Sequence, residues 1–437
     1  MTTTIAIDHL YRVEGHGGIK IVVGDQGIES CQMNIFEGTR FYEALLCGRG
    51  YQEAPGIVCR VCAICTSGHT LCSLGAIEDA MGITVPPIVR KLRNLLNLGQ
   101  WIESHALHLF CLAIPDYLGH ASVLGMLESH PVEVKKALGI KRVGNVIQEV
   151  VGGRAVHPVN MIVGGMGKCP DAQQLGQLAL ELDELLRQAV SLEGLIAALP
   201  NPEMGLPTPI FVALRGDGTE YPLTGDKIAA SGFDDIAISD FRGRINEMVV
   251  RHSTAKQSLY AKHPFMVGSV ARLHHNADLL DGAAKDIWRR LAPKKLTSLD
   301  NNLAQYIELV WALETARNLA GDLAKVCAPP PEANFPRLRN TKGHAALEVP
   351  RGTLHHAYEI DDQGLIKDVD IVTPTAQNLA AIEQDFAAAT DFWLKSSAKR
   401  EDKVIRENLE MIARAYDPCI SCSTHLLELL DVTVKKS

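Results

Sequence analysis

Two Cys-x-x-Cys pairs lie near opposite ends of this 437-residue chain, at Cys62 and Cys65 and at Cys419 and Cys422. Each pair places two sulfurs about one turn apart, a spacing that suits one metal ion, and four thiolates select zinc, iron–sulfur or another soft transition metal. All four can serve one site only if folding brings the two ends of the chain together. The sequence therefore predicts a metalloprotein whose metal site closes late in folding.

Two simpler readings of the cysteine pairs stay open at this point. A Cys-x-x-Cys pair also occurs in structural zinc sites and in dithiol redox motifs. Structural zinc sites generally take both pairs from one short segment, with roughly 15 to 20 residues between them. Here most of the chain separates the pairs, which disfavours a zinc knuckle.

Six segments carry a more specific signal than the cysteine spacing alone. In chain order they are RVEGH (12–16), RVCAICTSGH (60–69), GGR with HP (152–154, 157–158), PRG (350–352), TPTAQN (373–378) and DPCISCSTH (417–425). Their residues and their order resemble the signatures of nickel-iron hydrogenase large subunits. The resemblance covers nearly the full length of the chain.

The resemblance implies two metal sites. Cys62 and Cys419 would be terminal nickel ligands, whereas Cys65 and Cys422 would bridge nickel to an iron that carries CO and cyanide. Glu43, the backbone carbonyl of Ile371 and His425 would hold a hydrated magnesium, a ligand set with oxygen, nitrogen and water that this ion accepts.

Catalytic roles also follow from the resemblance. Glu14 would relay a proton away from the metal-bound thiolate of Cys419 by general base catalysis; a structural salt bridge is the alternative for this carboxylate. Arg351 would place a permanent charge over the open face of the metal pair, where an ordinary turn arginine would be a surface charge. Asp417 is expected to pair with Arg351 and make its burial tolerable.

Three further residues are expected around the cofactor. Pro350 adjoins Arg351, and Thr375 matches the family segment that packs around the iron diatomics, where a hydroxyl can donate to a cyanide nitrogen. Thr375 could instead belong to an ordinary turn. His69 would donate to a sulfur, and a satisfied core histidine is the competing view.

The chain departs from the family pattern at two positions. Ala63 replaces a glycine usual between the first two cysteines, which requires that this position has no positive φ. Ser104 stands where many uptake-type members carry an acidic residue near the metals. This serine and the compact length resemble the cytosolic, multi-subunit bidirectional branch.

Composition fits a cytoplasmic enzyme subunit. The net charge of −8, with both signs interspersed, argues against nucleic acid as a partner. Eleven cysteines without a secretory leader indicate a reducing compartment. The seven outside the paired motifs are expected to be small buried apolar residues, with Cys59 and Cys72 the nearest to the metal site; the others are Cys31, Cys47, Cys111, Cys169 and Cys327.

Electrons are expected to leave through other proteins. The chain shows no further cysteine cluster for an iron–sulfur relay and no dinucleotide-binding fingerprint. The resemblance implies a small subunit with Fe-S clusters and further electron-transfer subunits. It also implies a maturation chaperone, and a protease that removes the tail 426–437 after nickel insertion.

The predicted fold is α+β and predominantly α, with a central bundle of long helices and small peripheral β units. Helical periodicity marks 86–112, 172–199, 299–326, 378–394 and 401–415. The expected organisation is one large catalytic unit: a β segment (1–36), a mainly helical core (37–350), a β hairpin (351–376), C-terminal helices with the metal motif (377–425) and the tail. Residues 201–230 are expected to be irregular.

The sequence thus predicts the catalytic subunit of a nickel-iron hydrogenase with H2 as substrate. A hydrogen sensor that keeps the site, a structural zinc protein and a non-catalytic relative in complex I are the alternative functions. The complex I relative has lost the metal cysteines, whereas all four are present here.

Overall fold

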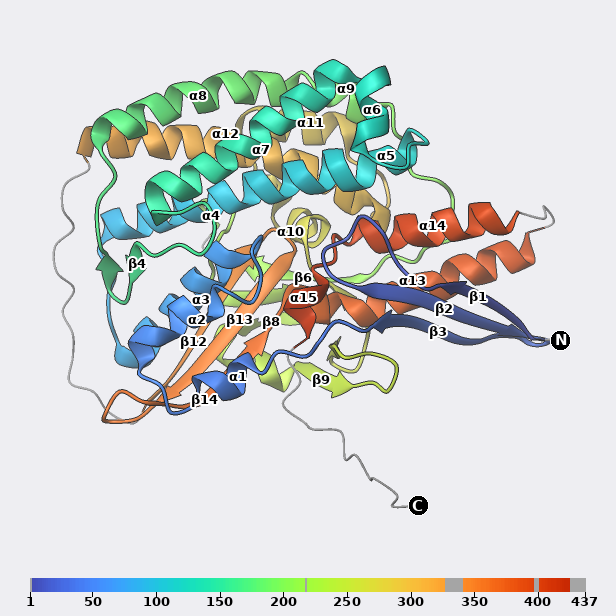
Figure 1. Ribbon diagram of the computed structural model, residues 1–437, viewed down its shortest axis with the longest axis horizontal. Helices are drawn as coiled ribbons and strands as arrows, with labels where there is room; N and C mark the ends of the chain where they lie inside the picture. Colours follow the sequence, from blue (N-terminus) through green and yellow to red (C-terminus); the bar gives the residue numbers. More distant parts are fainter. Residues whose placement is uncertain (1, 217, 327–340, 397–400, 425–437) are drawn as a thin grey trace.

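Four long helices form a bundle along one side of the molecule in the computed structural model, which describes residues 2–216, 218–326, 341–396 and 401–424. They pack against one another (Figure 1) and are α4 (Pro87–Leu107), α7 (Pro131–Gly152), α8 (Ala172–Val190) and α12 (Asn301–Val326). The small sheets that contain β1 (Thr3–Ile7) and β12 (Thr341–Val349) lie below the bundle in Figure 1. The predicted fold class is confirmed.

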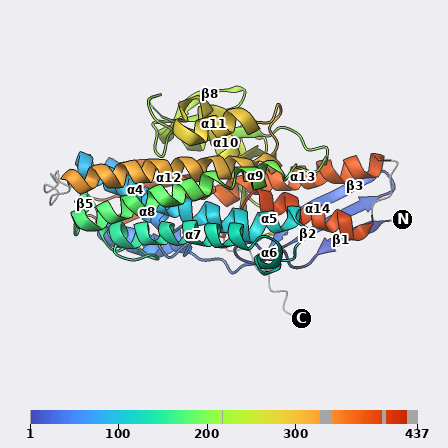
Figure 2. The same ribbon diagram turned by 90° about the horizontal axis from the view of Figure 1, so that it is seen from above.

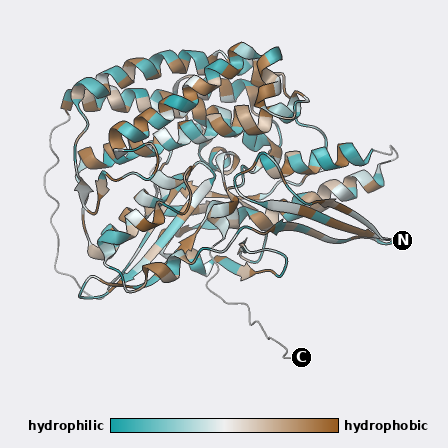
Figure 3. Cartoon of the chain, in the orientation of Figure 1, coloured by the Kyte–Doolittle hydropathy of each residue, from teal (hydrophilic) through white to brown (hydrophobic). Residues whose placement is uncertain are grey.

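Helix α8 buries one apolar stripe, whereas α4 and α12 are buried on all sides over about ten consecutive residues. On α8 the buried residues recur every three or four positions, from Leu175 through Leu178 and Leu182 to Leu185, as an amphipathic helix requires. Figure 3 shows polar and apolar residues alternating along α8. Helices α4 and α7 approach closely because Gly99 faces Gly144, where an added Cβ would lie 2.6 Å from the Gly99 carbonyl oxygen.

The predicted helices are present with two differences. The segment predicted as 86–112 turns π-helical over His108–Ala113, and the one predicted as 172–199 is divided into α8 and the short α9 (Glu193–Ala197). Near the C-terminus, α13 (Pro374–Lys395) and α14 (Asp402–Ala415) lie side by side.

A three-stranded antiparallel sheet carries the turn that contains Arg351. Its strands are β12 (Thr341–Val349), β13 (Gly352–Ile360) and β14 (Ile366–Val372). The hairpin of β13 and β14 was predicted, whereas β12 was not. Val349 pairs with Gly352, so Pro350 and Arg351 form a two-residue turn at the tip. Gly352 has φ 133°, which favours glycine.

A second antiparallel sheet opens the chain, as predicted. It contains β1 (Thr3–Ile7), β2 (Gly17–Gly24) and β3 (Gly27–Ile35), in that order. With α13 and α14 it extends to one end of the molecule, where the N-terminus lies (Figures 1 and 2).

Residues 201–230 are not wholly irregular, so that prediction was wrong. They contain β6 (Ile210–Arg215) and β7 (Lys227–Ala230), which join β8 (Phe233–Ala237) and β11 (Phe265–Met266) in one sheet. Apolar residues of these strands form a core of their own, including Val212, Leu214 and Ile228, and the glycines and prolines nearby occupy the connections. Together with α10 (Ser269–Asn276) and α11 (Gly282–Leu291), this part lies on one side of the bundle (Figure 2).

Helix α3 (Thr66–Met81) packs against β12 and β13. The remaining elements are short. They are α1 (Tyr42–Leu46), α2 (Ala54–Val58), α5 (Ile114–Tyr117), α6 (Val123–Ser129), α15 (Ile420–Ser423), the hairpins β4 (Met161–Ile162) with β5 (Gly165–Met166) and β9 (Ile245–Val249) with β10 (Lys256–Tyr260), and 3₁₀ turns at Tyr51–Glu53, Ile238–Gly243, Ala277–Leu279 and Ser298–Asp300. Among the helices of the described ranges, none combines the length and hydrophobicity of a membrane span.

The cysteines outside the paired motifs are less buried than predicted. Cys59 and Cys72 are buried, Cys47 is exposed, and the remaining described ones, Cys31, Cys111 and Cys169, are partly exposed. Cys47 contradicts the prediction because it follows the last turn of the short α1, at the surface. Cys327 lies outside the described residues.

Candidate metal centre

The two cysteine pairs meet where the first and last parts of the chain run side by side. Cys62 and Cys65 lie in the connection that leads into α3, and Cys419 and Cys422 flank the start of α15. Glu14 forms a parallel β bridge with Cys419, and the Ile420 amide donates to the Glu14 carbonyl at 2.9 Å. The N-terminal strand segment therefore holds the second cysteine pair in place.

Four buried sulfurs form one cluster. The sulfurs of Cys62, Cys65, Cys419 and Cys422 all lie within 4.8 Å of one another. The Cys419 sulfur is 2.8 Å from that of Cys422, 3.3 Å from that of Cys62 and 3.7 Å from that of Cys65. All four are free thiols. Four buried soft donors that converge in this way fit a transition-metal site.

Two thiols of the cluster hold their protons firmly, whereas a third loses its proton more easily. Hydrogen bonds from the thiols of Cys419, Cys422 and Cys65 hold the pKa of Cys62 well below its ordinary value. Burial raises the pKa values of Cys419 and Cys422. Metal ions must displace these protons in order to bind all four sulfurs.

Glu14 lies against the cluster. Its Oε2 accepts from the Cys419 thiol at 3.2 Å and from the Ser421 amide at 3.0 Å, and its Oε1 accepts from the Ser421 hydroxyl. Gly15 follows with φ 87°, and a Cβ there would lie 2.7 Å from Cβ of Ile420. Glycine after Glu14 is therefore what lets this segment approach the cysteines.

Arg351 reaches the cluster from the tip of the β12–β13 hairpin. Its Nη1 donates to the Cys65 sulfur at 3.3 Å, its Nε to the Asp417 carbonyl at 2.9 Å and its Nη2 to Asp417 Oδ1 at 3.0 Å. The predicted pair of Arg351 with Asp417 is confirmed, and both side chains are buried. Because the pair is nearly neutral, it can lie beside the sulfurs without an uncompensated charge.

A small enclosed cavity adjoins three of the sulfurs. It is lined by Cys65, His69, Val349, Arg351, Leu354, Pro374, Thr375, Cys419 and Cys422. Thr375 Oγ1 accepts from the Cys419 amide at 2.9 Å, so its own hydrogen remains available to a ligand. Pro350 is not among the lining residues.

His69 is in the cavity wall but contacts another histidine. It is buried, and its Nδ1 lies 3.3 Å from Nε2 of His356. Burial lowers the pKa of His69 to about 4, so the imidazole is neutral near neutral pH.

Two of the three expected magnesium ligands lie together. The Ile371 amide donates to Glu43 Oε1 at 2.9 Å. Because a strand residue directs its N–H and C=O to the same side, the Ile371 carbonyl faces the same side as Glu43. Glu43 Oε2 is buried without a hydrogen-bond partner among the described residues, and burial raises the pKa of this carboxyl to about 7. An unpaired buried oxygen of this kind fits a hard cation. His425 lies outside the described residues.

The structure describes both positions at which the chain departs from the family pattern. Ala63 is not among the described residues with positive φ, so this position does not need glycine. Ser104 is buried, and its hydroxyl has no hydrogen-bond partner among the described residues.

The sequence motif predicted no role for Ser421, which the structure shows as a donor to Glu14. Its position between Cys419 and Cys422 is the one sequence feature that points to a place at the metal centre.

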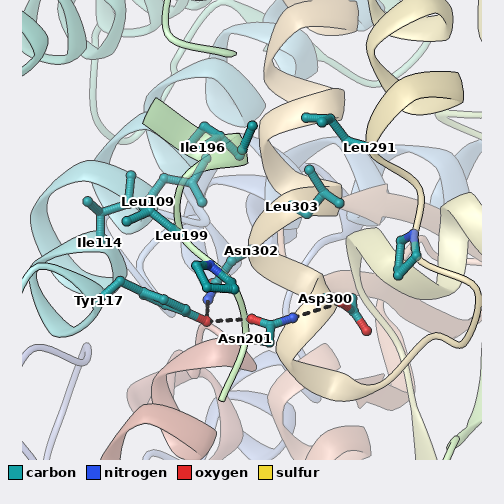
Figure 4. A pocket seen from close by; sticks show the side chains of 13 residues that line it. Leu109, Ile114, Tyr117, Ile196, Leu199, Asn201, Leu291, Asp300, Asn302 and Leu303 are labelled. Carbon is teal, nitrogen blue, oxygen red and sulfur yellow. Dashed lines mark hydrogen bonds between the residues drawn. The ribbon is translucent and has the colours of Figure 1, made fainter. Parts of the chain in front are cut away.

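A separate cavity of about 320 Å³ lies among α5, α9, α11 and α12 (Figure 4). Apolar side chains such as Leu109, Ile196 and Leu303 form its wall, and Tyr117 donates to Asn201, which donates to Asp300, at 2.8 Å each. No thiolate lines it.

Comparison with known proteins agrees with this geometry. The family model described as nickel-dependent hydrogenase matches residues 40–137 and 248–425. The chain is 38% identical over 430 residues to sulfhydrogenase 1 subunit alpha of Pyrococcus furiosus, covering 97% of this chain and 98% of that protein. It is 26% identical to the NAD-reducing hydrogenase HoxS subunit beta of Cupriavidus necator, covering 99% and 97%.

Solved structures share the fold. A chain of an NAD⁺-reducing [NiFe]-hydrogenase in the H2-reduced state superposes with a TM-score of 0.87 at 27% identity, covering 97% of this chain and 99% of that one. With the four converging cysteines and the matching relatives, these findings show that this chain belongs to the nickel-dependent hydrogenases, as the large, catalytic subunit of a nickel-iron enzyme.

Proposed function

We propose that this subunit converts H2 reversibly into two protons and two electrons at a nickel-iron pair bound by its four converging cysteines. The observation that carries the proposal is the contact of Glu14 and Arg351 with the same buried sulfur cluster. When bound, the metal pair supplies the centre at which the H–H bond is polarised and the electrons are taken up.

The cavity supports the assignment of ligands. It borders Cys65, Cys419 and Cys422 but not Cys62, so a ligand of the metals has room on the side of three of the sulfurs. By resemblance, Cys65 and Cys422 would be the bridging ligands, and Cys62 and Cys419 would be the terminal nickel ligands. In the metal-bound site all four act as thiolates.

Glu14 is proposed to carry the proton outward. The Cys419 sulfur accepts a proton from H2 and passes it to the adjacent Glu14 carboxylate by general base catalysis. The Ser421 amide and hydroxyl hold the Glu14 carboxyl group in place beside the Cys419 sulfur.

Arg351 is proposed to hold a positive charge over the metals. Its guanidinium stays charged, and Asp417 fixes its orientation from two atoms. Such a fixed charge stabilises negative charge that develops during bond cleavage.

Thr375 is proposed to bind a diatomic ligand of iron. Its hydroxyl hydrogen is free to donate to a cyanide nitrogen, while Pro374 and Leu354 give the apolar walls that suit CO. Pro350 contributes through the turn that places Arg351, and His69 closes the cavity beside the sulfurs.

A magnesium ion is proposed at Glu43, the Ile371 carbonyl and His425. The unpaired Glu43 Oε2 supports this assignment. By joining α1 to β14 and to the C-terminal segment, the ion would hold the second cysteine pair closed.

Electrons are proposed to leave to an Fe-S small subunit. The relatives' names identify them as subunits, alpha or beta, which supports a multi-subunit enzyme with further electron-transfer subunits. In the first cysteine motif Arg60 and Ala63 are exposed next to buried Cys62, so a partner can approach the sulfurs there. A cytoplasmic location, a maturation chaperone and a protease acting on 426–437 remain predictions.

The proposal is tested on the complex purified without air. Metal analysis should give equimolar nickel and iron, infrared spectra should show CO and cyanide bands, and H2 should reduce an artificial dye. Zinc instead of nickel, with no infrared bands, would refute the proposal. Full metal content and bands with negligible turnover would favour the hydrogen sensor.

A further inference from the structure

One face of α12 is polar although it is buried. Asn301, Gln305 and Glu308 are spaced three and four residues apart and therefore lie on one side of the helix, and all three are inaccessible to solvent. Buried polar groups are costly unless they are hydrogen-bonded. Each of these side chains is hydrogen-bonded, and at least one bond of each leads toward the residues that hold Arg351.

Gln305 completes the hydrogen bonding of Asp417. Its Nε2 donates to Asp417 Oδ2 at 3.0 Å, while Asp417 Oδ1 accepts from Arg351. Both carboxylate oxygens are therefore occupied, one by Arg351 and one by Gln305. Rotation of the carboxylate would break both bonds, so Gln305 limits the orientations of Asp417 and, through it, of Arg351.

His108 fixes the amide of Gln305 in turn. Its Nδ1 lies 2.5 Å from Gln305 Oε1 and its Nε2 lies 2.7 Å from the Arg414 carbonyl. The amide of Gln305 must give its NH2 to the carboxylate and its oxygen to His108. The two ring nitrogens of His108 therefore link the Gln305 amide to the backbone of Arg414. His108 begins the π-helical turn after α4, a local irregularity that often occurs at functional sites.

Asn301 and Glu308, on either side of Gln305, support the backbone near Asp417 and near Arg351. Asn301 Nδ2 donates to the Ala415 carbonyl at 2.8 Å, two residues before Asp417. Glu308 binds Arg272, whose guanidinium also donates to the Pro350 carbonyl at 3.0 Å. The backbone and the side-chain partner of Arg351 are thus both supported by one helix.

We propose that Gln305 is a positioning residue for Arg351, which it orients through Asp417 while His108 holds its amide. The inference rests on the proposed function, since it assigns a purpose to the orientation of Arg351. A buried amide that only stabilises the core is the competing explanation.

The first test compares Gln305→Met with Tyr306→Phe in the purified complex. Methionine keeps the volume but removes the donor to Asp417. Tyr306 is the neighbouring residue on α12, and its hydroxyl donates to the Ala189 carbonyl at 2.9 Å, toward α8. Each variant therefore loses buried hydrogen bonding on the same helix, and only Gln305→Met touches the partner of Arg351.

Gln305→Met should lower kcat for H2 oxidation about 10-fold or more, because a small misplacement of a catalytic group is expensive in rate, while KM for H2 stays within about twofold. Its infrared bands should shift from those of the parent, and nickel and iron content should be unchanged. Tyr306→Phe should match the parent in both readouts. Equal kcat and identical bands in Gln305→Met and the parent would overturn the proposal.

The second test needs neither metal nor turnover. In the full chain with ¹⁵N-labelled histidine, the His108 ring signals, assigned by their loss in His108→Gln, should shift in Gln305→Met and stay in place in Tyr306→Phe. Unchanged His108 signals in Gln305→Met would overturn the proposal. If the proposed function itself fails, the parent complex lacks the infrared bands and turnover while this measurement still gives its result, so the two failures are distinguishable.

Discussion

The Glu14 carboxylate lies 3.2 Å from the Cys419 sulfur although 405 positions separate the two residues in the chain. The contact forms only when the N-terminal segment pairs with the residues that precede α15. A proton acceptor and a metal ligand thus come together in the same folding step, which supports the view that the site closes late.

Glu14→Gln should stop proton transfer without removing the metals. The amide keeps the size of the carboxyl group but is not a base, so H2-dependent dye reduction should fall about 10²- to 10⁴-fold, the range typical of a lost general base. Nickel and iron content should stay at the parent level, because Glu14 is not a ligand. Turnover and metal analysis on the same preparation check this.

Glu37→Gln is the matched control for Glu14. Glu37 accepts from the His16 ring at 2.7 Å near the same N-terminal segment but has no contact with a cysteine among the described residues. Its variant should turn over H2 like the parent. Parent-like turnover in Glu14→Gln would rule out the proposed proton route.

Arg351→Lys tests whether orientation matters as well as charge. Lysine keeps the charge but loses the planar fork that contacts Asp417 and Cys65, so kcat should fall at least about 10-fold with metals retained. Arg93→Lys is the control, because Arg93 makes an equally bidentate pair with Glu78, at 2.7 Å for both bonds, away from the sulfurs. A similar loss in both variants would mean that the effect is structural.

Glu43→Gln should weaken magnesium binding. The substitution removes the anionic oxygen that lacks a partner, and Mg²⁺ is usually held by one or two carboxylates. The purified variant should contain less magnesium than the parent and should unfold at a lower temperature, whereas excess MgCl2 should restore part of the loss. Magnesium content equal to that of the parent would show that Glu43 has a purely structural role.

The sequence was sufficient to predict that the four paired cysteines meet, but not to predict the residues that support them. The cysteine pairs and Arg351 lie in short motifs, so their chemistry is visible in local residue patterns. The pairing of Arg351 with Asp417 was also predictable, because a buried guanidinium needs a counter-charge and Asp417 adjoins the second cysteine motif.

The contacts of Gln305 and His108 could not be predicted from the sequence. The apolar periodicity of α12 predicted its helix correctly, but an amide in a leucine-rich helix gives no sign of the partner it will reach, since the bond to Asp417 depends on tertiary packing. Strands β6 and β7 were missed for a related reason. Their pairing is set by a separate core, whereas the local glycines and prolines suggest only turns.

Asp385 should make the stability of the protein depend on pH in a predictable direction. It is buried on α13, accepts from the Tyr416 hydroxyl at 2.7 Å and from Ser298, and burial raises its pKa from 3.8 to about 6. Between these two values the folded chain binds more protons at this site than the unfolded chain does, so this contribution to stability declines as pH rises from about 4 to 6. The loss is complete above pH 6 and is on the order of 3 kcal/mol.

Asp385→Asn removes the ionisable group, so its stability relative to the parent should improve as pH rises from 4 to 7. Urea unfolding midpoints of both proteins at pH 4, 5, 6 and 7 measure this difference. Asp391→Asn is the control on the same helix, because Asp391 is exposed and pairs with Lys395 at 2.6 Å, and its difference from the parent should show no such rise. If the difference for Asp385→Asn is constant over the same pH range, Asp385 does not ionise near pH 6, and its two hydroxyl donors outweigh burial.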